Sequence, residues 1–184
     1  MARYAEPWRA YHVLAHIEHC LREFDRMRRL AEDRDAVQAA IWFHDAVYVP
    51  GAPDNEEESA ALADALLEAG GVELARRRRI AELILATSHQ SPPGSPDARL
   101  LTDIDLAILG APPVEYDAYA AAIRREFAAL AEAEFAAGRA AFIRGALSRP
   151  RIYSTDEYHE CLEAAARSNL VRELAALAPP AHPA

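Results

Sequence analysis

The sequence predicts an all-helical protein, and two observations carry this prediction. Apolar residues recur three and four positions apart along nearly the whole chain, which is the spacing of one face of an α-helix. Alternating runs rich in Val, Ile and Thr, which would indicate strands, are absent from the sequence. We therefore expect an all-α bundle of about six to eight helices.

The first half of the chain carries start and stop signals for four helices. Pro7 can open a first helix over residues 7–31, and a capping box at Asp35 begins a second that extends through AVQAAIWFHDAVY. Pro50 and the glycine after it then stop this helix. A third helix begins at a cap on Asn55 and continues to about Leu67, and a fourth covers residues 72–89.

The second half continues in the same way. After the proline-rich loop 91–96, a short helix over residues 97–110 is closed by a glycine. A long helical region follows over residues 114–148 and breaks near Gly138, and a last helix begins at a capping box on Ser154.

Length and cysteine usage predict a single domain in a reducing compartment. A chain of 184 residues can bury a sizeable core, so we expect one domain over residues 1–184. Its motif-bearing core covers about residues 8–110, and the C-terminal helices cover residues 114–176. The only cysteines, Cys20 and Cys161, are too few for a disulfide scaffold, and we expect them to be reduced.

Charge and hydropathy exclude two classes of partner. Twenty basic against 29 acidic residues give a net charge of −9, opposite to the surface that duplex nucleic acid requires. No window approaches about 18 uninterrupted apolar residues, and the N-terminus lacks the features of a signal peptide. We therefore expect a cytoplasmic protein that binds neither membrane nor duplex DNA, with its oligomeric state left open.

Three of the seven histidines fall within the predicted first helix. At 100° per residue, His12, His16 and His19 project from one narrow face. Because a buried imidazole must satisfy both ring nitrogens, three on one face suggest a metal, an anion or a wet cleft. The alternative is a solvated polar face beside Glu18 and Arg22.

Two further polar groups interrupt apolar segments. His44 and Asp45 lie inside AAIWFHDAVY, where a histidine and a carboxylate must be paired or must ligate something. A His–Asp pair satisfied by backbone at a helix end is the less favoured alternative. Asp103 and Asp105 interrupt LTDIDLAILG, and we expect one of them to face the core while the other caps the helix or lies exposed.

Together these residues predict a mixed nitrogen and oxygen metal site. One histidine of the first helix, His44, Asp45 and one of the two later aspartates give four ligands, which leaves positions for water and substrate. This set suits one divalent ion of Mn, Fe, Co, Ni or Zn. Such an ion lowers the pKa of bound water to about 7 and neutralises charge on a phosphoryl oxygen, as a hydrolytic site requires.

The motifs that carry this site resemble a known family. The segments AYHVLAHIEHC, IWFHDAVY, DNEEESA, LILATSHQ and LTDIDLAILG resemble the HD superfamily, and within it a small bacterial group of predicted metal-dependent phosphohydrolases. The resemblance covers roughly residues 8–150. It implies an HD-domain-like helical fold and hydrolysis of a small phosphorylated substrate such as a nucleotide, as a phosphomonoesterase or phosphodiesterase, through water activated on the ion.

The resemblance also implies residue roles. The implied metal ligands are His16, His44, Asp45 and Asp105. The family's last aspartate precedes a short apolar run, as Asp105 does, and this favours it over Asp103. By analogy with the cyclic-nucleotide phosphodiesterases, which share the Tyr-His-x-x-x-His stretch, His12 is the general acid.

Other residues match motifs around the ligands. His89 matches a histidine that some members use for a second metal or for the substrate phosphate. No second histidine pair lies between Asp45 and His89, so we expect one ion. Asn55 and Glu56 resemble a motif near the site, although an asparagine cap followed by acids is the simpler interpretation.

The remaining candidates have simple structural interpretations. Arg124 could clamp phosphate, yet an arginine on an alanine-rich helix commonly forms an ion pair, here with Glu126 or Glu132. Cys20 flanks the histidine face and is interpreted as a packed residue. Asp103, which the resemblance does not favour as a ligand, remains a candidate for binding substrate or for supporting the metal ligands.

Two alternative functions follow from the same sequence. An HD-fold ligand-sensing or interaction module would keep the fold, and even the metal, without turnover. The complete ligand set together with His12 argues against it. A purely structural bundle would show no change in melting temperature on addition of metal ions or EDTA.

Overall fold

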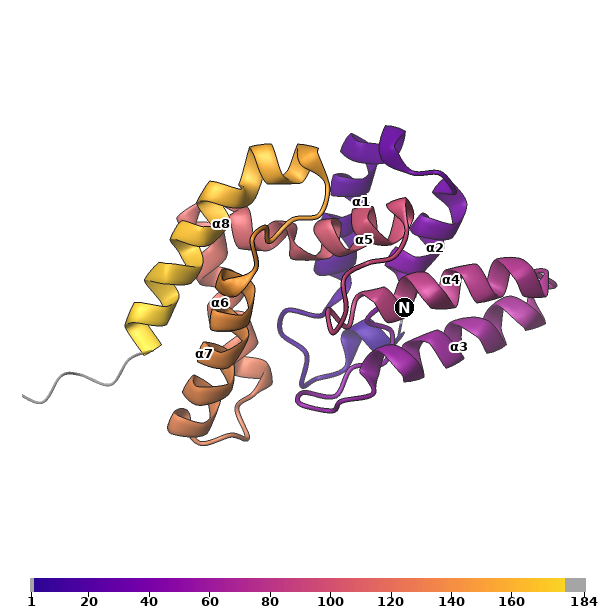
Figure 1. The fold of residues 1–184 in the computed structure, drawn as a ribbon. Helices are drawn as coiled ribbons and strands as arrows, with labels where there is room; N and C mark the ends of the chain where they lie inside the picture. The colour runs from indigo at the N-terminus through magenta and orange to yellow at the C-terminus, as the bar shows by residue number, and fades with distance from the viewer. Residues whose placement is uncertain (1, 178–184) are drawn as a thin grey trace, which may run out of the picture. The chain divides into compact units, whose positions relative to one another are not determined.

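The computed structural model of the chain describes residues 2–177, and every regular element within them is helical. This confirms the predicted all-α class (Figure 1). The described elements are η1 (Ala2–Ala5), α1 (Leu14–Met27), η2 (Arg28–Leu30), α2 (Arg34–Phe43), α3 (Asn55–Ala69), α4 (Leu74–Ala86), α5 (Pro96–Asp105), η3 (Leu106–Gly110), α6 (Pro113–Glu126), α7 (Glu132–Ser148) and α8 (Asp156–Leu177). No helix among them has the length and apolarity to cross a membrane. Residues 178–184, which include His182, lie outside the described residues.

The chain divides into two compact units. The N-terminal unit ends at Asp105 and contains α1 to α5, whereas the C-terminal unit begins at Leu106 and contains η3 and α6 to α8. All four predicted metal ligands and His12 belong to the N-terminal unit. Both cysteines are free thiols, with Cys20 buried and Cys161 exposed.

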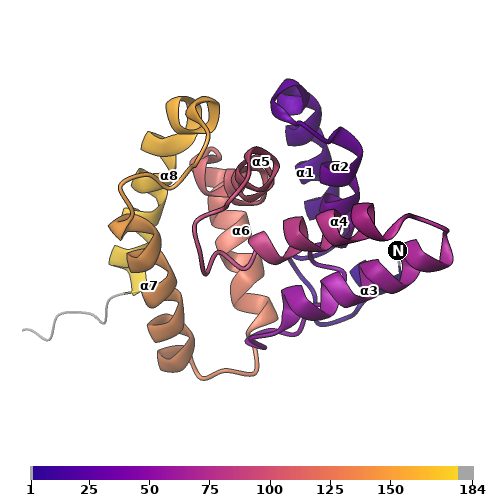
Figure 2. The same ribbon diagram turned by 45° about the vertical axis from the view of Figure 1, so that its right-hand side comes forward.

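The N-terminal unit is built around one apolar stripe on each helix. The buried residues of α1 include His16, Ile17, Cys20 and Phe24, and the spacings of three and four positions from Ile17 to Cys20 and from Cys20 to Phe24 place them on one face of an amphipathic helix. α1 packs on α2 and α5, and α2 also packs on α3 and α4. α3 and α4 form an antiparallel pair that lies side by side in both views (Figure 2).

A buried carboxylate fixes α5 against the start of α2. Asp97 is fully buried, and its oxygens accept from the backbone N–H groups of Glu32 (2.7 Å) and Asp33 (3.2 Å). The guanidinium of Arg79 on α4 donates to the same carboxylate at 3.0 Å. One side chain therefore ties three helices together, and α5 carries Asp105 at its far end.

The first helix begins later than predicted. It starts at Leu14, and Val13 before it is extended at φ −113° and ψ 177°, so Pro7 does not open it. The preceding backbone is held by tertiary bonds, since the carbonyl of His12 accepts from the guanidinium of Arg9 at 3.0 Å. The prediction that three histidines share one helix face is therefore wrong, because His12 precedes the helix.

The second helix also differs at both ends. Its N-cap is Asp33, whose Oδ1 accepts from the backbone N–H of Ala36 at 3.0 Å, so the predicted box at Asp35 is wrong. Its last residue is Phe43, and His44 is the C-cap. The His44–Asp45 pair consequently lies at the end of a helix and not inside one.

The C-terminal unit corrects two further boundaries. The break in the long helical region falls between Glu126 and Glu132, whereas Gly138 lies inside α7. The cap of the last helix is Thr155 and not the predicted Ser154. The hydroxyl of Thr155 accepts from the backbone N–H of Tyr158 at 3.4 Å, and the helix begins at Asp156.

Two glycines of the C-terminal unit give a matched stability prediction. A Cβ added at Gly110 would lie 2.6 Å from Leu162 Cβ and 3.0 Å from the Leu162 carbonyl oxygen. Gly110→Ala should therefore lower the free energy of unfolding by about 1–3 kcal/mol, measured by urea denaturation. Gly138→Ala, with no atom within 4 Å of the new Cβ, should raise it by about 0.5–1 kcal/mol. Equal effects of the two changes would contradict this packing.

A second prediction concerns pH. Burial raises the pKa of the Glu163 carboxyl, but backbone bonds from Ile152 and Tyr153 and the Arg167 guanidinium outweigh burial and lower it. A lowered folded pKa stabilises the fold above the unfolded pKa, and this stabilisation is lost as the pH falls. In Glu163→Gln, the free energy of unfolding should therefore fall less between about pH 5 and pH 3 than it does in the parent protein. Urea midpoints measured against pH check this, with exposed Glu160→Gln as the unchanged control.

Candidate metal centre

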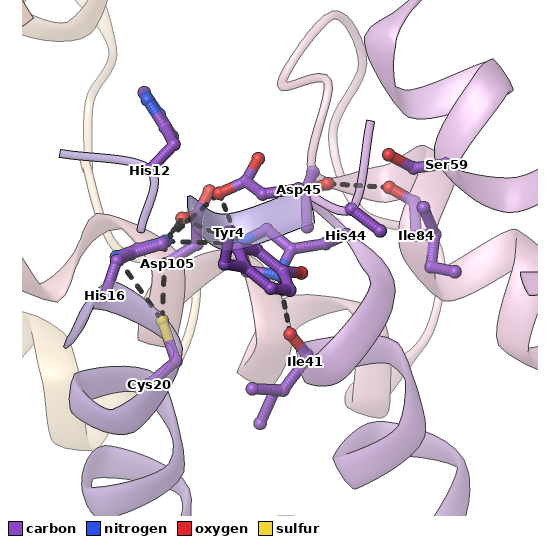
Figure 3. Close-up of polar contacts among 12 residues, drawn as sticks. Tyr4, His12, His16, Cys20, Ile41, His44, Asp45, Ser59, Ile84 and Asp105 are labelled. Carbon is purple, nitrogen blue, oxygen red and sulfur yellow. Dashed lines mark hydrogen bonds and ion pairs between the residues drawn. The ribbon is translucent and has the colours of Figure 1, made fainter. Parts of the chain in front are cut away.

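Three helix segments bring the predicted metal ligands together. His16 lies on α1, His44 and Asp45 follow directly after α2, and Asp105 is the last residue of α5. Their side chains point toward one another (Figure 3). We call these four residues the ligand cluster.

The donor atoms of the ligand cluster lie very close together. The Nε2 atoms of His16 and His44 are 3.2 Å apart. Asp45 Oδ2 lies 3.3 Å from His16 Nε2 and 3.1 Å from His44 Nε2. Asp105 Oδ1 lies 3.3 Å and 3.5 Å from the same two nitrogens.

These distances fit a shared divalent ion. Ligands bound at about 2.1 Å to one ion lie about 3.0 Å apart in octahedral and about 3.4 Å apart in tetrahedral geometry. Asp45 Oδ2 is moreover buried and accepts no hydrogen bond, although two imidazole nitrogens lie beside it. A buried carboxylate oxygen without a hydrogen bond is costly, and a cation among the four donors satisfies it.

The ring of His44 is oriented by its second nitrogen. Its Nδ1 lies 2.9 Å from the carbonyl oxygen of Ile41, so this nitrogen carries the proton and donates. In the neutral form of the ring, which is the form that binds a metal ion, Nε2 would then have its lone pair toward the cluster. Backbone carbonyls orient metal-binding histidines in this way in many proteins.

Cys20 contributes a sulfur to the same region. A set of donors that includes this sulfur and does not include Asp45, namely His16, Cys20, His44 and Asp105, has its donor atoms within 4.8 Å of one another and could also hold a metal ion. The Sγ atom lies 3.6 Å from Nε2 and 3.8 Å from Nδ1 of His16. These similar distances place the sulfur beside the imidazole ring. The burial of Cys20 agrees with its interpretation as a packed residue, and its position four residues after His16 on α1 brings the sulfur beside that histidine.

The charges of the cluster favour a cation. Burial raises the pKa of Asp45 and Asp105, but the histidines outweigh burial and hold both well below the usual range. His44 and His12 lower the pKa of Asp45, and His16, His44 and His89 lower that of Asp105. Both carboxylates are therefore ionised at neutral pH, which is the form that binds a metal ion.

The histidines show the reciprocal effect. Burial lowers the pKa of His44, but Asp45 and Asp105 outweigh burial and raise it well above the usual value. Without an ion, protons on the imidazoles balance the two carboxylates. A divalent cation would replace these protons, so its binding releases protons.

His12 lies beside the ligand cluster. Its ring stacks on Tyr48 with centroids 3.9 Å apart and an interplanar angle of 28°, and its centroid is 5.9 Å from that of His16. Its charge also lowers the pKa of Asp45. The half-buried His19 is outside the group of candidate metal-binding residues.

His89 is joined to the cluster through Asp105. Its Nε2 lies 3.0 Å from Asp105 Oδ2, while Oδ1 of the same carboxylate faces His16 and His44. Its backbone has φ 55°, the only positive value among the described residues other than glycine. Such strained conformations concentrate at functional sites, where surrounding structure maintains them.

The two aspartates of α5 are distinguished by the structure. Asp105 reaches the cluster, whereas Asp103 is 1% exposed and lies outside the group of candidate metal-binding residues. The expectation that the second aspartate caps or lies exposed is wrong, because α5 packs against α1, α2 and α4 and is covered on several faces.

Asn55 and Glu56 lie at the start of α3. The prediction that Asn55 caps this helix is wrong, since the N-cap position is Asp54 and the Asn55 amide instead bonds the backbone N–H (2.8 Å) and carbonyl (3.0 Å) of Val49. Burial raises the pKa of Glu56, the charge of Asp45 adds to it, and His89 opposes it. Glu56 is therefore within electrostatic reach of the cluster.

Arg124 belongs to the C-terminal unit. Its Nε lies 3.0 Å from Glu132 Oε2, and its Nη1 donates to the carbonyl of Phe127 at 2.8 Å. The ion pair with Glu132, which was one of the two interpretations of this residue, is therefore present.

Sequence reasoning missed one residue beside the ligand cluster, Arg9. Its side chain is fully buried, and it donates to the carbonyls of Asp45 (2.7 Å) and Ala46 (3.2 Å). A single arginine gives no sequence signal for burial, because arginine is rarely buried unless it is paired.

No known family model, curated protein or solved structure matches this chain. The geometry of the cluster therefore carries the functional conclusions below.

The ligand cluster gives a direct prediction. Co²⁺ or Zn²⁺ at about 100 times its dissociation constant should raise unfolding free energy by about 2.7 kcal/mol, and the melting temperature by several degrees. Asp45→Asn should abolish most of this shift because it removes the charge of an oxygen that lies 3.1 Å and 3.3 Å from the two imidazole nitrogens. Thermal denaturation with and without metal measures it. Asp25→Asn, an exposed change on α1, should keep the full shift, and an equal shift in the Asp45 variant would contradict the site.

Proposed function

We propose that this protein is a metal-dependent phosphohydrolase of the HD-superfamily type, acting on small phosphorylated molecules. The observation that carries the proposal is the convergence of two imidazole nitrogens and two carboxylate oxygens at 3.1–3.5 Å. His12 beside this convergence adds a proton donor for a leaving group.

The ligand cluster would hold one divalent ion through His16, His44, Asp45 and Asp105. Its mixed imidazole and carboxylate donors suit Mn²⁺, Fe²⁺, Co²⁺, Ni²⁺ or Zn²⁺. Such an ion, when bound, supplies an acidified water and neutralises charge on a phosphoryl oxygen. Two histidines and two carboxylates leave coordination positions open, as catalytic sites need.

His12 fits the role of general acid. The Tyr48 ring stacked on it restricts its orientation, and it is half-buried beside the ligands without being one of them. It would donate its proton to the oxygen of the departing alcohol. His89, whose Nε2 lies 3.0 Å from Asp105, would bond nonbridging oxygens of the substrate phosphate.

The local charge supports an anionic substrate. The whole chain carries a net charge of −9, so phosphate must be attracted by positive groups at the site. The bound ion would supply such a group within the N-terminal unit, and the imidazoles of His12 and His89 would donate hydrogen bonds to the anion. The order of the motifs along the chain, which resembles that of HD phosphohydrolases, supports the same reaction.

Metal-dependent turnover is the first test of this proposal. Metal-free protein is mixed in turn with each of the five ions and with nucleoside monophosphates, sugar phosphates, cyclic nucleotides and bis(p-nitrophenyl) phosphate. We expect phosphate or alcohol release that EDTA abolishes and that His44→Ala reduces to background. Full activity in the His44 variant would contradict the site, and metal binding without any turnover would favour the sensing module.

A variant of His12 tests the general acid. His12→Gln should retain the metal and lower kcat by about 10²- to 10⁴-fold for alkyl phosphates, whose alkoxides leave poorly without a proton. For p-nitrophenyl phosphate, whose leaving group is stable as an anion, the loss should be much smaller. Steady-state kinetics on both substrates measure the difference. His19→Gln is the control, and equal losses on both substrates would assign His12 another role.

A further inference from the structure

The backbone that follows α2 is held by side chains at every residue from Asp45 to Val49. The carbonyls of Asp45 and Ala46 accept from Arg9 at 2.7 Å and 3.2 Å. The carbonyl of Val47 accepts from the Ser59 hydroxyl at 3.1 Å. The next two accept from the Trp8 indole at 3.3 Å and from the Asn55 amide at 3.0 Å. We call residues 45–49 the anchored loop.

Arg9 has the most contacts of these side chains. Its Nε donates to Glu6 Oε2 at 2.9 Å, and its charge lies over the rings of Tyr4 and Tyr48 at 5.4 Å and 5.6 Å from their centroids. The side chain is fully buried. A buried guanidinium needs this many partners because losing hydration is costly.

One nitrogen of Arg9 joins the two halves of the site. Its Nη1 donates both to the carbonyl of Asp45 at 2.7 Å and to the carbonyl of His12 at 3.0 Å. The same planar group therefore sets the backbone spacing between a predicted metal ligand and the predicted general acid. The anchored loop also carries Tyr48, whose ring stacks on His12.

We propose that Arg9 is the positioning residue of the metal centre. It holds the backbone of Asp45 and of His12 in one arrangement, so that the Asp45 carboxylate reaches both imidazoles and His12 stays beside them. This inference rests on the proposed metal site. Because its donors already bond Glu6 and three carbonyls, Arg9 orients the site and does not bind the substrate phosphate.

Lysine cannot replace this geometry. The guanidinium presents donors in a rigid planar fork, so it reaches carbonyls on two segments and a carboxylate at once. An ammonium group has three donors on a single atom. Arg9→Lys therefore keeps the positive charge but loses the simultaneous hydrogen bonds. Arg9→Met keeps much of the side-chain length but loses both the charge and the hydrogen bonds.

The test is Co²⁺ binding to the full-length, metal-free protein, followed by the visible absorption of the ion. We expect Arg9→Met and Arg9→Lys to weaken Co²⁺ affinity by about 10- to 100-fold, the usual effect of losing a group that orients metal ligands. The absorption band should also change in position or intensity, because it reports the geometry around the ion. If Arg9→Met does not fold, Arg9→Lys alone decides the outcome.

A matched control separates positioning from general stability. Arg77 is also a buried arginine of the N-terminal unit, and its ion pairs are with Asp64 and Glu68, both at 2.8 Å. Arg77→Met should lower the melting temperature yet leave Co²⁺ affinity and absorption unchanged. Folded Arg9 variants that bind Co²⁺ like the parent would overturn the role of Arg9. A parent protein that takes up no Co²⁺ would instead overturn the metal site itself.

Discussion

The hydrogen bonds from Arg9 to the carbonyls beyond α2 are the constraint on which the candidate centre depends. Ending α2 at Phe43 leaves carbonyls that the helix cannot satisfy, and partly buried carbonyls need donors. Arg9 supplies them for Asp45 and Ala46 and places a positive charge at the C-terminal end of the helix, where it interacts favourably with the helix dipole. The same interaction turns the chain so that a carboxylate follows a histidine into the cluster. A regular helix through this point would have directed consecutive side chains about 100° apart around its axis.

The electrostatics of the N-terminal unit follow from this arrangement. Two carboxylates and two imidazoles share a largely buried site, so the histidines lower the pKa of both carboxylates and the two carboxylates raise the pKa of His44, in each case toward the charged form. Burying these charges is costly, and the Asp45 oxygen that is buried without a hydrogen bond contributes to that cost. A cation bound among the four donor atoms would offset this cost. The strain at His89 and the stacking of His12 on Tyr48 lie around the same position, which is consistent with a site organised for binding rather than for stability alone.

The sequence allowed the helical class and much of the candidate site to be predicted, because both depend on local patterns. Apolar periodicity identifies the helices, and a histidine beside an aspartate in an apolar run identifies groups that must be partnered. The positions of helix ends were less predictable. His12 lies outside α1 and the His44–Asp45 pair lies beyond α2 because tertiary bonds, chiefly from Arg9, compete with helix continuation. Such tertiary hydrogen bonds cannot be predicted from the residues near a helix end. Asn55 illustrates the same limit, since its amide bonds the anchored loop and not its own helix.

X-ray absorption spectroscopy of the Co²⁺-loaded protein tests the central claim most directly, because it reports the atoms bound to the ion. We expect a nitrogen and oxygen shell at about 2.0–2.2 Å, with the outer-shell scattering of two imidazole rings. His16→Ala should remove one of these rings. A sulfur at about 2.3 Å would add Cys20 to the ligands, whereas a spectrum without imidazole scattering would contradict a metal centre built on His16 and His44.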